Sequence, residues 1–185
     1  MPSQSRMLLR GALAVFLFAW IARVSPAGAQ EPILNIGMST AKPGDPIDIP
    51  ITLSGEEQPQ MGAITVEITF PKAALHFVRG SAGLSGEMAE ANVEGTAEDA
   101  SDPSMSSLTV SINAKKPIKP GILAYVHFRV ATDAQKGKIA LKALSIQAKT
   151  LDGGSQNLSK GRDGQVEVFA RDETIPLIGC FFFTH

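Results

Sequence analysis

The sequence predicts an all-β fold, a two-sheet antiparallel β-sandwich of about nine strands. Apolar residues alternate with polar residues along most of residues 33–169, which is the period-two pattern of strands that bury one face. Turn sequences rich in glycine, proline and aspartate separate these stretches, and no stretch keeps a helical period. Eight or nine such strands need a second apolar layer to cover them, so we expect two facing sheets around one core.

The first strand is expected from residue 33, with Leu34, Ile36 and Met38 on one face. A turn follows at residues 42–45, Lys-Pro-Gly-Asp. Proline presets φ at its second position, and glycine accepts the positive φ that a type II turn requires at its third. The sequence therefore predicts a tight turn between the first two strands.

Apolar residues alternate again in residues 47–53 and 64–70. Pro50, inside the first of these stretches, has no N–H to donate to a neighbouring strand, which predicts that this strand lies at an edge. The second stretch, in which Ile64, Val66, Ile68 and Phe70 alternate with threonines and a glutamate, is the clearest half-buried strand of the chain.

The remaining strands are predicted by shorter patterns. One of them changes phase, since Ile139 and Leu141 share one face and Leu144 and Ile146 then continue the alternation out of step. Such a change indicates a β-bulge or a kink between two short strands. The other expected strands lie at residues 75–77, 108–112, 122–130 and 166–168.

Residues 80–105 interrupt the pattern with a long, acidic stretch rich in glycine, serine and alanine. No lysine or arginine lies between Arg79 and Lys115. One interpretation is a binding loop or a weak Ca²⁺ site, because Ca²⁺ prefers several carboxylate oxygens. The other is a solvated surface loop, which charge runs usually form. The carboxylates are Glu87, Glu90, Glu94, Glu98, Asp99 and Asp102.

The two ends of the chain differ from the rest. Residues 1–29 resemble a secretion signal, with a positive start, an apolar stretch from Gly11 to Ala22 and an A-x-A site at Ala27-Gly28-Ala29. The apolar run is too short for a membrane anchor and Arg23 ends it, which favours cleavage and a secreted protein that begins at Gln30. Residues 171–185 form an apolar tail, ending in three phenylalanines before Thr184, that is too short to span a bilayer.

Composition restricts the function classes. The net charge is −1 and three leader arginines would be removed on secretion, so nothing attracts nucleic acid or an anionic membrane. Cys180 is the single cysteine, which excludes an intrachain disulfide. His76, His127 and His185 form no recognisable catalytic or zinc motif, and we expect no enzyme, no cofactor and no metal on this chain. A pair of carboxylates meeting in space would still allow glycosidase chemistry.

Four stretches together resemble the cohesin family, the secreted jelly-roll sandwiches of bacterial cellulosomes. Each motif is weak alone, but their order and spacing are moderately specific and cover about residues 33–169. This likeness implies a jelly-roll topology for a domain at residues 30–170. The stretches are residues 42–51, residues 61–78, residues 117–130, and Leu151-Asp152-Gly153-Gly154 followed by residues 164–168.

The resemblance implies a protein-binding module. Cohesins hold dockerins, which are small Ca²⁺-loaded helical domains, through a sheet face built partly from the strand that matches residues 63–70. Any Ca²⁺ is then expected on the partner. The outward residues that would line the face are Thr65, Glu67, Thr69, Thr109, Ser111 and Asn113. In cellulosomal cohesins of the best-known type, Asn and Asp begin that strand, where this chain has Ala63 and Thr65, so the dockerin specificity of that type does not carry over.

Two other functions stay open. A carbohydrate-binding module shares this kind of sandwich, and a fold does not decide function. Sugar rings stack on exposed aromatic faces, however, and without the leader the chain has no tryptophan and only Tyr125 as its tyrosine. A structural or adhesion subunit that pairs through a free strand edge is the other alternative. Roles in polysaccharide breakdown or in cell-surface assembly agree with a secreted binding module.

Overall fold

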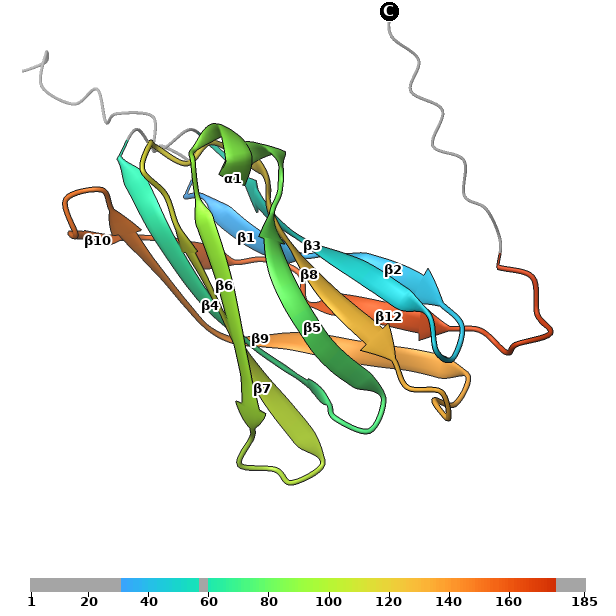
Figure 1. The fold of residues 1–185 in the computed structure, drawn as a ribbon. Coiled ribbons are helices and arrows are strands. Elements are labelled where there is room, and N and C mark those ends of the chain that lie inside the picture. Colours follow the sequence, from blue (N-terminus) through green and yellow to red (C-terminus); the bar gives the residue numbers. More distant parts are fainter. Residues whose placement is uncertain (1–30, 57–59, 176–185) are drawn as a thin grey trace, which may run out of the picture. The chain divides into compact units, whose positions relative to one another are not determined.

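The computed structural model describes residues 31–56 and 60–175, and it confirms the β-sandwich (Figure 1). One sheet has five strands, in the order β11 (Ser159–Lys160), β1 (Ile33–Ile36), β3 (Pro46–Ser54), β8 (Gly121–Val130) and β5 (Leu75–Ala82). The other sheet runs β2 (Met38–Ala41), β12 (Gly164–Val168), β9 (Gly137–Thr150), β4 (Met61–Pro71), β7 (Met105–Asn113) and β6 (Asn92–Asp99), with β10 (Ser155–Gln156) paired to β9.

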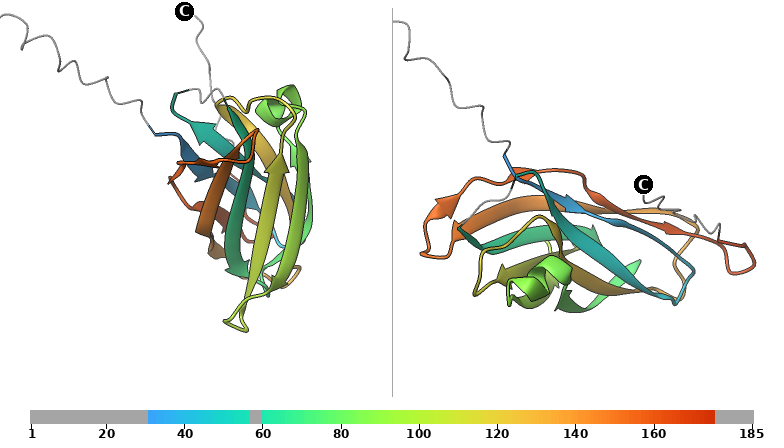
Figure 2. Two further views of the ribbon diagram at one scale, coloured as in Figure 1. Left: turned by 90° about the vertical axis from the view of Figure 1, so that its left-hand side faces the viewer. Right: turned by 90° about the horizontal axis from the view of Figure 1, so that it is seen from above.

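The two sheets face each other across one apolar core (Figure 2). The inward-facing residues of both sheets fill this core. The phenylalanines of β4, β5 and β8 form its aromatic centre. Phe128 meets Phe70 edge to face at 5.1 Å between ring centroids and Phe77 at 6.0 Å. Edge-to-face aromatic pairs stabilise a core beyond what the burial of their apolar area contributes. Ladder pairs are antiparallel except at the edges, where β1 pairs β11 and β12 pairs β2 in parallel.

The first predicted strand is divided between the two sheets. β1 pairs with β3 in the five-stranded sheet, whereas β2 pairs with β12 in the other. Gly37 lies at the crossing, where a Cβ atom would come within 2.4 Å of Pro50 Cγ. Leu34 and Ile36 are buried as expected, but Met38 is 67% exposed. The prediction that Met38 shares their face is therefore wrong, because the chain changes sheets after Ile36.

The prediction of an edge strand at Pro50 is also wrong. β3 lies between β1 and β8, inside the five-stranded sheet. The β1 ladder ends at the pair Ile36–Ile51, and the carbonyl of Pro50 accepts the N–H of Gly37 at 2.8 Å. Since N and C=O of one strand residue point to the same side, the missing N–H of Pro50 faces the place where β1 has already left the sheet. An interior strand tolerates proline there.

The predicted phase change in β9 is a β-bulge within one continuous strand. Glu67 of β4 is opposite Ser145 and Ile68 is opposite Ala143, so Leu144 has no partner in β4. Leu144 is 61% exposed, which corrects the prediction that it continues the buried alternation with Ile146. The extra residue restores the inward alternation one position later.

Residues 80–105 are not a loop, and both loop interpretations are therefore wrong. The segment completes β5, forms the short helix α1 (Leu84–Met88), and then forms β6, which pairs with β7 from Asn92 to Asp99. The residues of β6 that alternate with its polar ones are Val93, Gly95 and Ala97, and their side chains are too small to give a clear strand pattern in the sequence. Gly95 leaves space for Phe77, since a Cβ atom on Gly95 would lie 2.4 Å from Phe77 Cζ.

The turn at residues 42–45 has the predicted geometry. Gly44 has a φ of 95°, Asp45 N–H donates to Lys42 C=O at 3.1 Å, and the Asp45 carboxylate accepts the N–H of Lys42 at 2.9 Å. The start of the predicted tail contacts the sandwich here, since Lys42 Nζ donates to Arg171 C=O at 2.8 Å. The predicted leader and residues 176–185 lie outside the described residues. Within the part of the chain that the structure describes, no helix is long and apolar enough to cross a membrane.

Candidate protein-binding face

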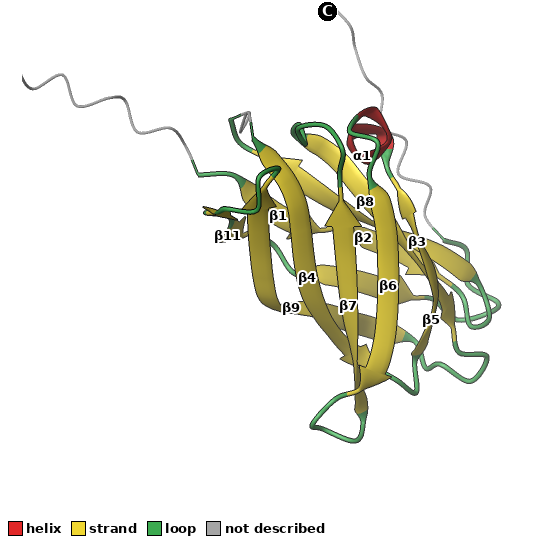
Figure 3. Cartoon of the chain, turned by 60° about the vertical axis from the view of Figure 1, so that its left-hand side comes forward, coloured by secondary structure: helices red, strands yellow, loops and turns green. Residues whose placement is uncertain are grey.

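The structure brings the predicted binding residues together on the outer face of the seven-stranded sheet. Strands β9, β4, β7 and β6 lie side by side there (Figure 3). We call the outward side chains of these four strands the docking face. The predicted residues occupy its two central strands, where Thr65 is opposite Ser111 and Glu67 is opposite Thr109. The other two predicted residues face residues outside the predicted set, since Asn113 is opposite Ala63 and Thr69 is opposite Ser107.

The predicted residues differ in how much surface they offer. Thr109 and Asn113 are exposed, and Thr65, Glu67 and Ser111 are half-buried. Thr69 is only 9% exposed, and its hydroxyl donates to the Lys142 carbonyl at 3.5 Å, the limit of a hydrogen bond. Thr69 therefore adds little contact area, and the accessible centre of the face is formed by the other five.

Glu67 is fixed at the centre of the docking face by two serines from neighbouring strands. Its Oε1 accepts the hydroxyl of Ser107 on β7 at 2.8 Å, and its Oε2 accepts the hydroxyl of Ser145 on β9 at 3.2 Å. The bulge at Leu144 places Ser145 opposite Glu67. The carboxylate is thus held in position before any partner binds, which lowers the ordering entropy that binding costs.

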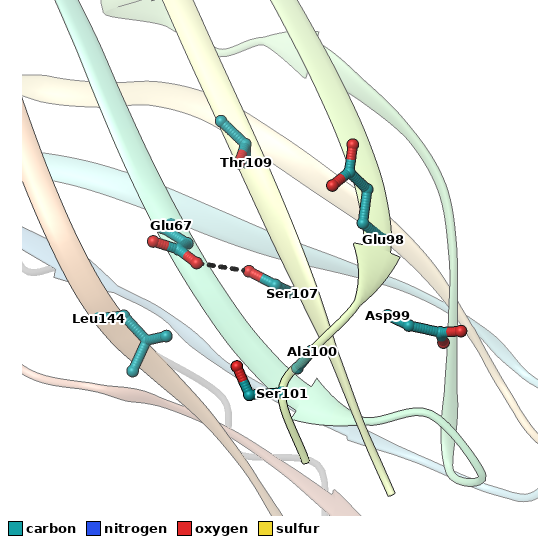
Figure 4. A pocket seen from close by; sticks show the side chains of 8 residues that line it. All are labelled: Glu67, Glu98, Asp99, Ala100, Ser101, Ser107, Thr109 and Leu144. Atoms are coloured by element: carbon teal, nitrogen blue, oxygen red, sulfur yellow. Dashed lines mark hydrogen bonds between the residues drawn. The ribbon is translucent and has the colours of Figure 1, made fainter. Parts of the chain in front are cut away.

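A shallow hollow of about 240 Å³ opens beside Glu67 (Figure 4). Its carboxylates come from three positions, with Glu67 on one side and Glu98 and Asp99 at the end of β6. Leu144, turned outward by the bulge, gives it one apolar wall. No lysine or arginine is among its lining residues, but Lys72 Nζ lies 3.1 Å from Asp99 Oδ1 and pairs with that carboxylate. Glu67 and Glu98 are therefore the carboxylates that are complementary to a cationic side chain of a partner. The full lining is Glu67, Glu98, Asp99, Ala100, Ser101, Ser107, Thr109 and Leu144.

The turn that closes the hollow is held by Asp102. Its Oδ1 accepts the hydroxyl of Ser104 at 2.7 Å and the N–H of Ser104 at 2.9 Å. These hydrogen bonds from Ser104, the hydroxyl first and then the N–H, lower the pKa of the Asp102 carboxyl. The turn between β6 and β7 therefore keeps its negative charge at neutral pH and adds to the acidic side of the docking face.

Charge is distributed unevenly across the docking face. On β9, the exposed Lys142 and Lys149 lie opposite Thr69 and Ala63. On β6, the exposed Glu94 and Glu98 lie opposite Ser111 and Ser107. Hydroxyl and amide side chains of β4 and β7, with the carboxylate of Glu67 among them, lie between the basic edge and the acidic edge. Such a pattern fixes the orientation of a partner of complementary charge more than it raises affinity.

Sequence reasoning missed β6 as a strand, and it assigned no binding residues to either outer strand of the docking face, β6 or β9. Asn92, Glu94, Thr96 and Glu98 alternate with smaller residues, and this period-two signal was available in the sequence. The acidic composition concealed it, because the segment resembled a solvated loop. The residues of β9 were missed because the bulge shifts their face by one position. Among the described residues no cluster of three or more His, Cys, Asp or Glu side chains could hold a metal ion.

Comparisons with known proteins agree on the family of this architecture. The family model described as the cohesin domain matches residues 33–168. Among solved structures, the chain resembles a non-cellulosomal cohesin from the archaeon Archaeoglobus fulgidus. The sequences are 20% identical over 77% of this chain and 94% of that one, with a TM-score of 0.57. No curated protein matches the chain significantly.

Two further solved structures show the same fold. The cohesin–dockerin complex Coh-OlpA–Doc918 from Clostridium thermocellum is matched at 16% identity over 75% of this chain and 99% of that chain, with a TM-score of 0.60. The solution structure of CaCohA2 from Clostridium acetobutylicum is matched at 19% identity over 75% of this chain and 90% of that one, with a TM-score of 0.58. At these identities the likeness concerns the fold.

Proposed function

This chain belongs to the cohesin family, and from that membership we propose that it binds a dockerin-type protein domain through the docking face. Cohesin domains are non-catalytic binding modules, and the matched structure from Clostridium thermocellum is a cohesin–dockerin complex. The observation that carries the proposal is the preformed outer face of β9, β4, β7 and β6, with Glu67 fixed by Ser107 and Ser145 at its centre.

The face suits a rigid helical partner. A sheet held by ladders on both sides of β4 and β7 loses little backbone freedom when another surface packs against it. The exposed Thr109 and Asn113 and the half-buried Thr65 offer short side chains, over which a helix can approach closely. Burying a hydroxyl group that keeps a hydrogen-bond partner costs little free energy.

Charge indicates how the partner is oriented. A lysine or arginine of the partner would enter the hollow beside Glu67 and Glu98, since Asp99 already pairs with Lys72. Acidic side chains of the partner would lie over Lys142 and Lys149 on β9. Reversing that arrangement would place like charges together, which costs several kcal/mol in close contact. The specificity therefore differs from that of cohesins with Asn and Asp at the start of the strand, where this chain has Ala63 and Thr65.

We also propose that the protein is secreted after cleavage of residues 1–29, and that the binding serves an extracellular assembly. Sequencing the amino terminus of the protein recovered outside the producing cell tests this step. A protein that begins at Gln30 is the expected result. A chain that keeps residues 1–29, or that stays inside the cell, would contradict it.

The docking proposal is tested by capturing a partner on the immobilised full chain from the secreted proteins of the producing organism, with Ca²⁺ and again with EDTA. We expect a partner with paired aspartate-rich loops that is held only with Ca²⁺, because such loops fold around the ion. Thr109→Arg, at the exposed centre of the docking face, should abolish capture. Thr132→Arg, in the turn between β8 and β9, is the matched control and should not.

Two outcomes would contradict this function. Capture of the same partner by the Thr109→Arg variant would show that the partner binds elsewhere. Retention on a polysaccharide column, together with the absence of any protein partner, would favour the carbohydrate-binding alternative.

A further inference from the structure

A second cluster of polar side chains lies on the outer face of the five-stranded sheet, away from the docking face. Three adjacent strands contribute one residue each: Asp48 from β3, His127 from β8 and Ser81 from β5. Asp48 is opposite His127 in the ladder, and Ser81 is opposite Tyr125, two residues along β8. The strand order β3, β8, β5 therefore places the imidazole between a carboxylate and a hydroxyl.

The three groups are joined by two short hydrogen bonds. His127 Nδ1 lies 2.5 Å from Asp48 Oδ1, and His127 Nε2 lies 2.7 Å from Ser81 Oγ. A carboxylate only accepts, so Nδ1 carries the proton and donates it to Asp48. In the neutral ring Nε2 then has a lone pair and accepts the Ser81 hydroxyl. This is the arrangement in which an imidazole acts as a base toward a serine.

A β-bulge in β5 creates this arrangement. Phe77 pairs with Phe128 and points to the core, but Arg79, not Val78, is the next residue in the ladder and pairs with His127. If Val78 were paired normally and the strand had no bulge, Ser81 would share the inward face of Phe77, because residues 77, 79 and 81 of a regular strand lie on one face. The bulge turns Ser81 to the outer face, beside His127. Val78, the inserted residue, is exposed.

The surroundings hold the imidazole in place while leaving it reachable. Val126 and Phe128, on either side of His127 in β8, are buried in the core and fix the strand beneath the ring. The His127 side chain is 18% exposed, Ser81 is half-buried, and Asp48 is 61% exposed. The base is thus largely shielded from water on the protein side, whereas the hydroxyl can be approached from the solvent.

We propose that Ser81 is an activated nucleophile that takes acyl groups from carboxylic esters. As Ser81 Oγ bonds to the carbonyl carbon, its proton passes to His127 Nε2, and Asp48 stabilises the resulting imidazolium. The ester C–O bond then breaks, and the alcohol leaves with the proton from Nε2. The products are acyl-Ser81, free alcohol and neutral His127, so atoms and charge balance. The proposal concerns one covalent step without turnover, which agrees with a non-catalytic binding module.

The test uses a biotinylated alkyl fluorophosphonate on the folded full chain. Ser81 Oγ bonds to phosphorus, the P–F bond breaks, and fluoride and the serine proton are released. Peptide mapping by mass spectrometry is expected to place the adduct on Ser81. Ser81→Ala should remove it, and H127Q should slow labelling by about 100-fold or more, the contribution of a positioned base. Ser104→Ala is the matched control, because Ser104 also donates to a carboxylate but has no imidazole beside it.

Several results would overturn the proposal. These are an adduct spread over exposed serines, equal labelling rates for native protein and H127Q, or equal labelling of native and urea-unfolded protein. Circular dichroism establishes that each variant is folded. If H127Q does not fold, D48N and the comparison of folded with unfolded native protein decide the question. These readouts do not depend on docking, so the two proposals can fail separately.

Discussion

The carboxylate of Asp163 accepts the backbone N–H of Ala143 at 3.0 Å, at the position where β9 bulges. The β12 ladder ends at the pair Gly164–Leu141, so the backbone groups of Ala143 have no ladder partner on that side. Lys160 completes the arrangement, since its Nζ donates to the Ala143 carbonyl at 2.8 Å and lies 2.9 Å from Asp163 Oδ1. Two side chains thus replace the missing strand, and they support the bulge that carries Leu144 and Ser145 to the docking face.

Replacing Asp163 should therefore weaken the sandwich. Asp163→Ala leaves the Ala143 N–H without its acceptor and removes the ion-pair partner of Lys160. We expect a loss of about 1 kcal/mol in the free energy of unfolding, the size of one hydrogen bond in a partly exposed site. Urea unfolding at neutral pH measures it.

The control for this substitution is Asp133→Ala, at an exposed position in the turn after β8. It should change the free energy of unfolding by less than about 0.5 kcal/mol. Equal losses for the two variants would show that the bond between Asp163 and Ala143 is not what stabilises the bulge.

The same site predicts a loss of stability in acid. Partial burial raises the pKa of Asp163, but the hydrogen bonds from Lys160 and from the Ala143 N–H outweigh it, so the pKa is below its ordinary value of 3.8. A group with a lowered folded-state pKa stabilises the fold above its unfolded pKa, and this contribution disappears as the pH falls through the folded pKa. The difference in urea midpoint between native protein and Asp163→Asn should be constant near neutrality and shrink below about pH 4. A difference that grows in acid would contradict this.

Much of the architecture could be predicted because alternation reports burial directly. Strands at residues 64–70, 108–112 and 122–130 have apolar residues on one face, and these are buried as expected with one exception. Ile122 is only half-buried, and its neighbour Leu123 is buried in its place, beside a shift in the pairing of β8 with β3. The choice of the docking face came from the resemblance to cohesins, and the alternation indicated which residues of its strands point outward. The outward direction of the five accessible predicted residues could therefore be read from the alternation within each strand.

Predictions failed where pairing, and not alternation, decides the outcome. Met38 continues the pattern of Leu34 and Ile36, but the chain changes sheets between them. The missing N–H of Pro50 faces a place where no partner strand lies, because the β1 ladder ends at Ile36. The sequence does not show where β1 ends. The cluster of Asp48, His127 and Ser81 was invisible because three strands and an unrecognised bulge bring it together.

The crossing of the first strand can be tested with a double-mutant cycle. Gly37→Ala places a methyl group 2.4 Å from Pro50 Cγ, so one of the two strands must shift. We expect a loss of about 1–3 kcal/mol in the free energy of unfolding, the usual cost of overpacking. Adding Pro50→Ala removes the ring that the methyl group meets, and the combined loss should be smaller than the sum of the single losses. Additive losses would show that the two residues do not constrain each other.

Deleting Leu144 tests whether the bulge is an insertion into an otherwise regular strand. Without Leu144, the inward residues Ile139, Leu141, Ala143, Ile146 and Ala148 alternate without interruption, and Ser145 stays next in register after Ala143 along β4. We therefore expect the shortened chain to fold, with a loss of about 1–2 kcal/mol. Deleting Leu141 is the matched control, and it should abolish folding, because a one-residue slip moves its neighbours to the wrong face. Circular dichroism and thermal unfolding distinguish the two. If both deletions unfold the protein, the bulge is required for the fold; if only the Leu144 deletion folds, its role is to shape the docking face around Glu67.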